Sequence, residues 1–327
     1  MLDHGGRLRR AAQQYGIAVA DWLDLSTGIN PQGWPVPELP AAAWSRLPEE
    51  TDGLVPAAHD YYGAAHVLPV AGSQAAIQAL PYLRPRGRVG VLSPGYAEHG
   101  HAWRQAGHSV VPLNPDTLGR ELGPFDVAVL IQPNNPTGTR FAKEVVLAWH
   151  AALAARGGWL VVDEAFIDAT PEHSLAPLTD RPGLIVLRSL GKFFGLAGAR
   201  VGFALAQPDL LQRLAERLGP WTVAGPARLV AEQALRDTTW QASARTQLQA
   251  AGERLAELLR RHGLTPDGGC ALFQWLRHDS AADLHKYLAR RGILTRLFDA
   301  PASLRLGLPG GEAAWTRLDA ALAEWQR

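Results

Sequence analysis

The chain has 327 residues, a formal net charge of +1 and a hydrophobic content of 47%. This length allows two domains with sizeable cores, and the balanced charge argues against a nucleic-acid groove or an anionic membrane surface. A single cysteine, Cys270, excludes an intrachain disulfide framework and a zinc site built on several thiolates, and it fits a reducing cytoplasm. The sequence shows neither a signal peptide nor an apolar run of the roughly 18 to 20 residues that a membrane span requires. We therefore expect no nucleic acid, membrane or metal as a partner.

The first motif is a His-Gly-Gly tripeptide at residues 4–6, which precedes an expected short helix from Arg7 to Tyr15. Two glycines let backbone amides approach an anion closely, and an imidazole can donate a hydrogen bond to a phosphate. A frayed chain end is the alternative. Further on, residues 24–31 are typical of a strand that runs into a turn, and a plain Asn-Pro turn is a sufficient local explanation for them.

A strand expected at residues 68–70 is followed by Gly72, Ser73 and Gln74 and then by an apolar-periodic helix. The backbone amides at a helix start and the hydroxyl of Ser73 favour a phosphate at this point. A simple helix cap would explain the same residues.

Tyr96 comes shortly after the next buried strand, expected at residues 89–92. Its flat apolar face can stack on an aromatic ring, or it can pack at the rim of the core. His99 and His101 follow without a third ligand at metal spacing. We interpret both histidines as solvated side chains on a helix face.

Two polar residues follow the strands expected at 127–131 and 159–162. In Pro-Asn-Asn-Pro-Thr-Gly, residues 133–138, the prolines and the glycine fix a turn that aims Asn135. Asp163 comes directly after the second strand. Because burying a charge without a partner costs several kcal/mol, its position predicts a cationic partner.

Lys192 is one of only three lysines in the chain, and it lies between apolar runs at 184–187 and 201–205. A lysine amine can lose its proton through burial or cationic neighbours and then form a Schiff base, which an arginine cannot do. Ser189 and Arg200, both natural phosphate ligands, lie nearby. This glycine-rich turn predicts a site for a phosphorylated aldehyde, with an ordinary surface lysine as the alternative.

Glycines and prolines mark the expected domain boundaries, with four prolines between residues 31 and 40 and a second group between 219 and 226. We expect residues 1–40 to form an amino-terminal arm and part of a small domain. Residues 41–219 are expected to form a large domain and residues 220–327 a small carboxyl-terminal domain.

Arg296 and Arg305 lie in strands expected at 293–297 and 303–308, which follow a strand expected at 270–276. A guanidinium can hold a carboxylate by two parallel hydrogen bonds, which fixes orientation as well as charge. Ordinary surface cations are the alternative for both arginines.

The string Ser-Leu-Gly-Lys-Phe-Phe-Gly-Leu-Ala-Gly-Ala-Arg-Val-Gly, residues 189–202, resembles the cofactor-lysine segment of pyridoxal-phosphate enzymes of the aspartate aminotransferase fold. The resemblance runs from His4 to about Pro309. Within that superfamily the chain is most similar to the threonine-phosphate decarboxylase family, on the strength of His-Gly-Gly and of Asp-Glu-Ala-Phe-Ile-Asp at 163–168. Histidinol-phosphate aminotransferases are the close relatives. The resemblance implies a fold type I transferase, α/β throughout, with a mostly parallel seven-stranded sheet, a smaller α/β domain and a homodimeric assembly.

The resemblance also implies pyridoxal 5'-phosphate as the cofactor. Lys192 matches the residue that carries it and Asp163 the ligand of its pyridinium nitrogen, which makes both catalytic. Asn135 matches the partner of the phenolic oxygen, and Phe166 stands where aminotransferases often have a tyrosine donor. The other expected cofactor contacts are Gly72, Ser73, Gln74, Tyr96, Ser189 and Arg200.

For the substrate, Arg305 resembles the arginine that grips the carboxylate, and Arg296 resembles one that relatives use for the phosphate. We assign the amino-terminal arm to the phosphate as well. Leu47 replaces a tyrosine whose hydroxyl, in relatives, reaches the cofactor phosphate of the neighbouring subunit, so that hydrogen bond is not expected here. The expected substrate contacts are His4, Gly5, Gly6, Thr27, Gly28, Asn30, Asn135, Arg296 and Arg305.

The resulting hypothesis is a cytoplasmic lyase that decarboxylates O-phospho-L-threonine to (R)-1-aminopropan-2-yl phosphate for cobalamin biosynthesis. Transamination of histidinol phosphate is the alternative, since Lys192 can serve as acid or base in either reaction. A non-catalytic regulator of the same fold is a third interpretation, which the competent residues at the cofactor positions disfavour.

Overall fold

The computed structural model describes residues 4–115 and 123–325. The chain divides into two compact units. We call the first, within Met1–Gln32, Pro136–Thr139 and Ala244–Arg327, the terminal unit, and the second, within Gly33–Asn135 and Arg140–Ser243, the sheet unit. The domain boundaries expected at residues 40 and 219 stay a prediction, because compactness alone does not show which segment folds independently.

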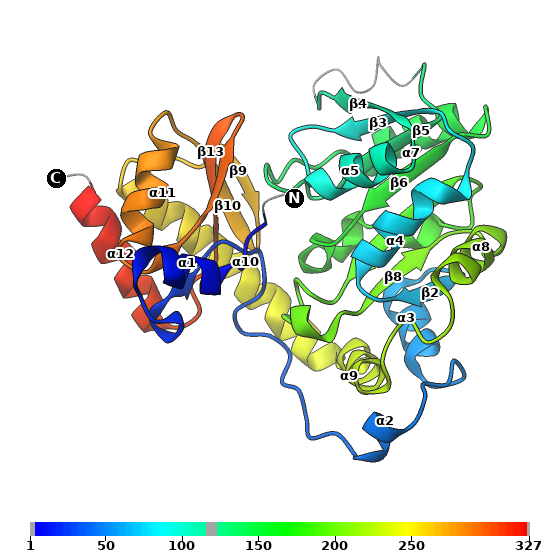
Figure 1. Ribbon diagram of the computed structural model, residues 1–327, viewed down its shortest axis with the longest axis horizontal. Helices are drawn as coiled ribbons and strands as arrows, with labels where there is room; N and C mark the ends of the chain where they lie inside the picture. Colours follow the sequence, from blue (N-terminus) through cyan, green and yellow to red (C-terminus); the bar gives the residue numbers. More distant parts are fainter. Residues whose placement is uncertain (1–3, 116–122, 326–327) are drawn as a thin grey trace. The chain divides into compact units, whose positions relative to one another are not determined.

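A seven-stranded sheet forms the centre of the sheet unit, in the order β2-β8-β7-β6-β5-β3-β4 (Figure 1). The strands β4, β3, β5, β6 and β7 pair in parallel, whereas β8 is antiparallel to both β7 and β2. The expected mostly parallel sheet of seven strands is thus confirmed. The strands are β2 (Val67–Val70), β3 (Arg88–Leu92), β4 (Ser109–Leu113), β5 (Val127–Ile131), β6 (Trp159–Asp163), β7 (Leu184–Ser189) and β8 (Gly202–Leu205).

The inner strands are continuous apolar runs because both faces of the sheet are covered. Every residue of β5 and β7 is buried. One face packs against α4 (Ser73–Ala79), α5 (Ala97–Gln105) and α8 (Pro208–Leu218) (Figure 1). Trp103 of α5 lies in a single core cluster with Val129 of β5. This packing holds the strand ends rigidly, so that the loops that follow them are well positioned.

Further helices complete the sheet unit. The helices α2 and α3 both pack against α9. These helices are α2 (Ala42–Ser45), α3 (Leu54–Tyr62), α7 (Lys143–Ala154) and α9 (Gly225–Arg236), and α10 (Thr238–Arg261) runs through the boundary at residue 244. Short 3-10 helices span Leu80–Leu83, Ile167–Ala169, Pro171–His173, Ala176–Leu178 and Ala197–Ala199.

The terminal unit contains two small sheets. One pairs β1 with β11 in parallel, and the other is antiparallel in the order β12-β13-β10-β9. The single strand expected at 270–276 was wrong, because the chain reverses between β9 and β10 within that apolar run. The elements are α1 (Leu8–Tyr15), a 3-10 helix (Val19–Asp21), β1 (Leu23–Asp24), β9 (Gly268–Cys270), β10 (Phe273–Arg277), α11 (Ala281–Ala289), β11 (Ile293–Leu294), β12 (Arg296–Asp299), β13 (Ala302–Gly307) and α12 (Glu312–Trp325). Within residues 4–115 and 123–325, no helix is both long and apolar enough to cross a lipid bilayer.

Candidate active site

Loops from six strands meet at one edge of the seven-stranded sheet. The parallel strands β3, β5, β6 and β7 end there; β2 ends there as well, and β8 begins there because it runs antiparallel to its two neighbours. The register sets Val70 and Ser189 on either side of Gly202, and Ile131 and Leu187 on either side of Asp163. In open α/β sheets ligands bind beyond the carboxyl ends of the parallel strands, so this edge is the candidate site.

A cavity of about 140 Å³ lies at this edge. All ten residues expected to contact the cofactor line it, although they are spread from residue 72 to residue 200. The role of each one stays a prediction. The complete lining is Gly72, Ser73, Gln74, Tyr96, Ile131, Asn135, Asp163, Ala165, Phe166, Ser189, Lys192 and Arg200.

Asp163 ends β6 and is only 3% exposed. Its Oδ2 accepts a hydrogen bond from Nε2 of His99 at 2.8 Å, and its Oδ1 accepts one from the backbone N–H of Ala165 at 3.0 Å. His99 is itself buried, with 1% exposure, so its interpretation as a solvated side chain was wrong; His101 is exposed, as expected. The ring N–H and the amide N–H hold the Asp163 carboxylate in one orientation at the end of the cavity.

The region around Gly72 provides an anion-binding cradle. A Cβ at Gly72, where φ is +71°, would lie 2.6 Å from Nη2 of Arg200, and one at Gly202 would lie 2.4 Å from the backbone nitrogen of Ser73. Arg200 has a left-handed backbone with φ of 55°, which costs a non-glycine residue about 1–2 kcal/mol. The two glycines therefore let a guanidinium and the start of α4 come together, where both favour an anion.

Lys192 and Tyr96 are both half-buried at the cavity. The Lys192 Nζ lies 5.4 Å from the centroid of the Phe166 ring. The Tyr96 hydroxyl donates to the side-chain oxygen of Gln74 at 3.2 Å. Burial, together with the carboxylates of Glu98 and Asp163, raises the pKa of Tyr96 to about 12, so the phenol stays neutral near pH 7. A neutral, half-buried aromatic face suits stacking on a planar ring.

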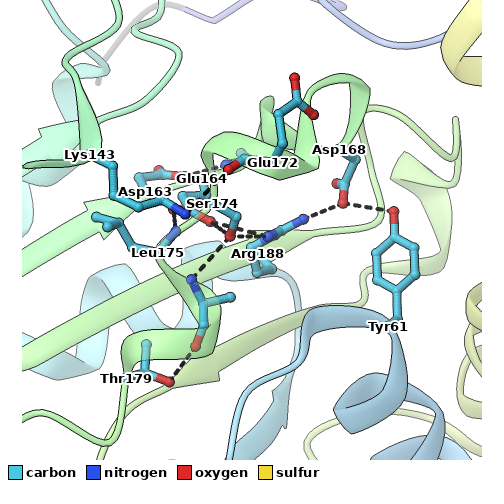
Figure 2. Close-up of polar contacts among 12 residues, drawn as sticks. Tyr61, Lys143, Asp163, Glu164, Asp168, Glu172, Ser174, Leu175, Thr179 and Arg188 are labelled. Atoms are coloured by element: carbon cyan, nitrogen blue, oxygen red, sulfur yellow. Dashed lines mark hydrogen bonds and ion pairs between the residues drawn. The ribbon is translucent and has the colours of Figure 1, made fainter.

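A buried network of ion pairs is formed by residues that are neighbours, in the sequence, of residues lining the cavity (Figure 2). The guanidinium of Arg188 contacts Asp168 on one side, and on the other it donates to Glu164 at 3.1 Å and to Ser174 at 3.0 Å. Burial alone would lower the pKa of Arg188, but the two carboxylates outweigh it and raise that pKa. Arg188 directly precedes Ser189, and Glu164 directly follows Asp163. The network therefore ties together the two segments that carry the central site residues.

Most of the expected substrate contacts lie in the terminal unit. His4, Gly5 and Arg296 line a cavity of about 300 Å³ there. Arg305 is 6% exposed, and its Nη2 donates to the carbonyl of Ser26, which also lines the cavity, at 2.7 Å. The backbone N–H of Gly6 donates to Oγ of Ser26 at 2.7 Å. The structure thus brings the amino-terminal arm and the expected anion-binding arginines together around one serine.

Four expected substrate contacts fall elsewhere. Thr27 and Gly28 are not among the residues that line the cavity around His4, Gly5 and Arg296. The side-chain oxygen of Asn30 accepts the backbone N–H of Gln32 at 2.9 Å, as in a local Asn-Pro turn. Asn135 lines the cavity of the sheet unit instead. Their contacts with a substrate stay predictions.

The donor set of the sheet-unit cavity fits pyridoxal phosphate. The cofactor needs an amine for its aldehyde, a carboxylate for its ring nitrogen and cationic or hydroxyl donors for its phosphate. Lys192, Asp163 and Arg200 provide one group of each kind, and Gly72 leaves the space that a side chain would fill. This site defines a pyridoxal-phosphate enzyme built on an aminotransferase-like fold.

Comparison with known proteins agrees with this class. Residues 54–318 match the family described as aminotransferase class I and II, and the chain belongs to this family. It is 64% identical over 322 residues to a threonine-phosphate decarboxylase of Pseudomonas aeruginosa, with 98% of this chain and 97% of the relative covered. A threonine-phosphate decarboxylase of a Sinorhizobium species is 43% identical over 333 residues, 99% of this chain and 98% of that one.

A solved structure supports the fold type I assignment. Histidinol-phosphate aminotransferase from Sinorhizobium meliloti, in complex with pyridoxal-5'-phosphate, superimposes with a TM-score of 0.84 at 21% identity, covering 100% of this chain and 98% of that one. Pyridoxal 5'-phosphate is accordingly the cofactor of this family member.

The contact of His99 with Asp163 was missed by the sequence analysis, although His99 lies in the first turn of α5, three residues after Tyr96, which directly precedes that helix. We expect His99→Phe to weaken pyridoxal-phosphate binding and to lower kcat, each by about tenfold. The reason is that a buried carboxylate oxygen loses its donor, which costs about 1–3 kcal/mol. Titration of the apoenzyme with cofactor and steady-state kinetics measure the two effects. His101→Phe, on the exposed side of the same helix, is the matched control, and equal behaviour of the two variants would contradict the assignment.

Proposed function

We propose that, in the cytoplasm, this chain decarboxylates O-phospho-L-threonine with pyridoxal phosphate as cofactor. The products are carbon dioxide and (R)-1-aminopropan-2-yl phosphate, which serves cobalamin biosynthesis. The observation that carries the proposal is the 64% identity, over almost the whole chain, to a threonine-phosphate decarboxylase. The cavity of the sheet unit supports it with suitable groups for the cofactor.

The chain's own residues have distinct tasks in this reaction. When bound, the cofactor supplies an aldehyde for the substrate's amino group and a ring that accepts an electron pair. The bond from Cα to the carboxylate breaks, carbon dioxide leaves, and a proton takes its place on Cα. Asp163 keeps the ring nitrogen protonated, and Nζ of Lys192 delivers the proton to Cα. Arg305 holds the carboxylate through two hydrogen bonds, which fixes the direction of the bond that breaks.

The test is carbon dioxide release from O-phospho-L-threonine by the cofactor-loaded protein, with L-threonine as the matched substrate without a phosphate. We expect release from the phosphorylated substrate and at least about a hundredfold lower kcat/KM for threonine, because threonine cannot make the charge-assisted hydrogen bonds that the phosphate makes. A keto product from histidinol phosphate and 2-oxoglutarate, formed as fast as carbon dioxide or faster, would overturn the proposal in favour of transamination.

We further propose a homodimer. Several large apolar side chains of the sheet unit are exposed, among them Trp44 at 70%, Leu47 at 65%, Trp221 at 57% and Val36 at 55%. Trp44 and Leu47 are separated by only two residues in the chain, and closely grouped exposed apolar side chains of this size are typical of surfaces that a second chain covers. Analytical ultracentrifugation should give a mass near twice 35.3 kDa, and Trp44→Glu should shift it towards the monomer. A wild-type protein that sediments as a monomer at micromolar concentration would contradict this.

A further inference from the structure

The cavity of the terminal unit that His4, Gly5 and Arg296 line is strongly cationic. It lies between α1, the strands β11 and β12, and α11, and its volume is about 300 Å³. Arginines and histidines from three parts of the chain line it, with one carboxylate among the lining residues: His4, Arg7, Arg10, His285, Arg296 and Asp299. Three permanently charged guanidiniums against one carboxylate create a positive potential, which favours a multiply charged anion such as a phosphate monoester.

Two of these arginines lie at the start of α1, whose other face is anchored: Arg7 directly precedes the helix, and Arg10 is in its first turn. Ala11 is buried in a cluster with Trp22 and Leu294, and Leu8 packs against the same cluster. Arg10 lies three residues after Arg7 and so faces the same side, towards the cavity. Arg9 and Arg10 are both exposed, but Arg9 is not part of the lining. Arg7 and Arg10 thus face the cavity, whereas Arg9 does not.

Gly5 and Gly6, which precede this helix, fix the position of its start. A Cβ at Gly5 would lie 2.2 Å from the carbonyl oxygen of Ser26, so only glycine allows the arm to pass so close. Oγ of Ser26 accepts the N–H of Gly6 and donates to Asp24 at 2.5 Å. These contacts of Gly5 and Gly6 with Ser26 hold His4 and Arg7, on either side of the two glycines, close to the end of β1, and the cavity is preformed.

Arg305, which we expect to hold the substrate's carboxylate, is the strand neighbour of an arginine that lines this cavity. Arg296 pairs with Arg305 across β12 and β13. Burial, and next the charge of Arg296, lower the pKa of Arg305 to about 10. Two adjacent guanidiniums in this setting favour a ligand with two anionic groups, because each group offsets part of the mutual repulsion. A phosphorylated amino acid carries a carboxylate and a phosphate in one small molecule.

We propose that Arg7 and Arg10 are specificity-determining residues that bind the phosphate of the substrate together with His4 and Arg296. This inference rests on the proposed function, since it assigns the substrate's phosphate to this cavity. It goes beyond the family resemblance, which pointed only to the tripeptide at 4–6 and to Arg296. Arg7 and Arg10 make the cavity a site for the doubly charged phosphate and disfavour unphosphorylated amino acids.

The experiment compares Arg7→Gln, Arg10→Gln and the double variant with Arg9→Gln, the matched control on the same helix. Each cofactor-loaded variant is assayed for carbon dioxide release from O-phospho-L-threonine and, by isothermal titration calorimetry, for binding of inorganic phosphate. We expect KM to rise about tenfold for each single variant and about a hundredfold for the double variant, with kcat changed less than threefold. Phosphate binding should weaken in parallel, whereas Arg9→Gln should stay within twofold of wild type. Circular dichroism melting curves verify that all variants fold.

The outcomes separate this inference from the proposed function. If wild type releases carbon dioxide but the double variant behaves like Arg9→Gln, the inference is wrong and the proposed function stands. If wild type releases none but binds phosphate in a manner that depends on Arg7 and Arg10, the proposed function is wrong and the cavity is still a phosphate site. A fall in kcat with unchanged KM and phosphate affinity also overturns the inference, since it shows a structural effect.

Discussion

Lys192→Ala should abolish carbon dioxide release from O-phospho-L-threonine, with kcat lowered by at least about 10³-fold. In the proposed reaction Lys192 would hold the cofactor through its aldehyde and deliver the proton to Cα, so the variant would lose both contributions. General acid–base catalysis alone contributes roughly 10²–10⁴-fold, and loss of the covalent anchor adds to that effect. The measurement is carbon dioxide evolution at saturating cofactor and substrate, together with the visible absorbance of the lysine-bound cofactor.

Lys143 offers a matched control in the same unit. Its Nζ donates to the carbonyl of Glu172 at 3.2 Å at the surface (Figure 2), and Lys143 is not among the residues that line the cavity. Lys143→Ala should leave kcat within twofold of wild type. Residual turnover above about 1% in Lys192→Ala would show that another group supplies the proton, and the assignment to Lys192 would then be wrong.

The large sheet could be predicted from the sequence because buried parallel strands are continuous apolar runs. β5 and β7 have that form, and both lie where expected. β4 was missed because it is a partly exposed edge strand that contains Pro112. The hairpin of β9 and β10 was missed because its apolar residues continue through the chain reversal, so the sequence contains no polar or glycine-rich turn between the two strands.

The cofactor cavity could be predicted because its residues lie at strand ends within recognisable motifs. The groups that support it could not. His99 acts on a carboxylate 64 residues later in the chain, and no local pattern connects the two. Arg7 and Arg10 lie at the start of a short helix in an arginine-rich chain, so only the tertiary contacts of α1 separate them from Arg9.

Arg188 is the supporting residue whose loss should affect stability most. It is 2% exposed, and the side chains of Glu164 and Asp168 are fully buried beside it. Arg188→Met keeps similar volume but leaves two buried carboxylates without their cation. Breaking a buried ion pair on one side costs about 3–5 kcal/mol. Chemical denaturation of the cofactor-loaded protein, followed by tryptophan fluorescence, measures the loss.

The matched control is Arg236→Met, which removes an exposed i,i+4 pair with Glu232 at 3.2 Å in the same unit. Such a pair is worth about 0.5 kcal/mol, so this variant should unfold nearly as wild type does. A loss in Arg188→Met no greater than in the control would show that the network contributes nothing to stability.

A second variant separates the charge from the packing. If the cost in Arg188→Met comes from uncompensated carboxylates, adding Glu164→Gln and Asp168→Asn should recover a large part of the lost stability, because neutral amides in the same space need no cation. The Glu164→Gln change keeps a side-chain oxygen that can accept the N–H of Leu175, which Glu164 accepts at 2.7 Å. Recovery of stability without recovery of cofactor affinity would mean that the ion pairs also align Asp163 and Ser189, the neighbours of Glu164 and Arg188 in the chain. The stability measurement thus tests the network, and the cofactor titration tests whether it sets the geometry of the site.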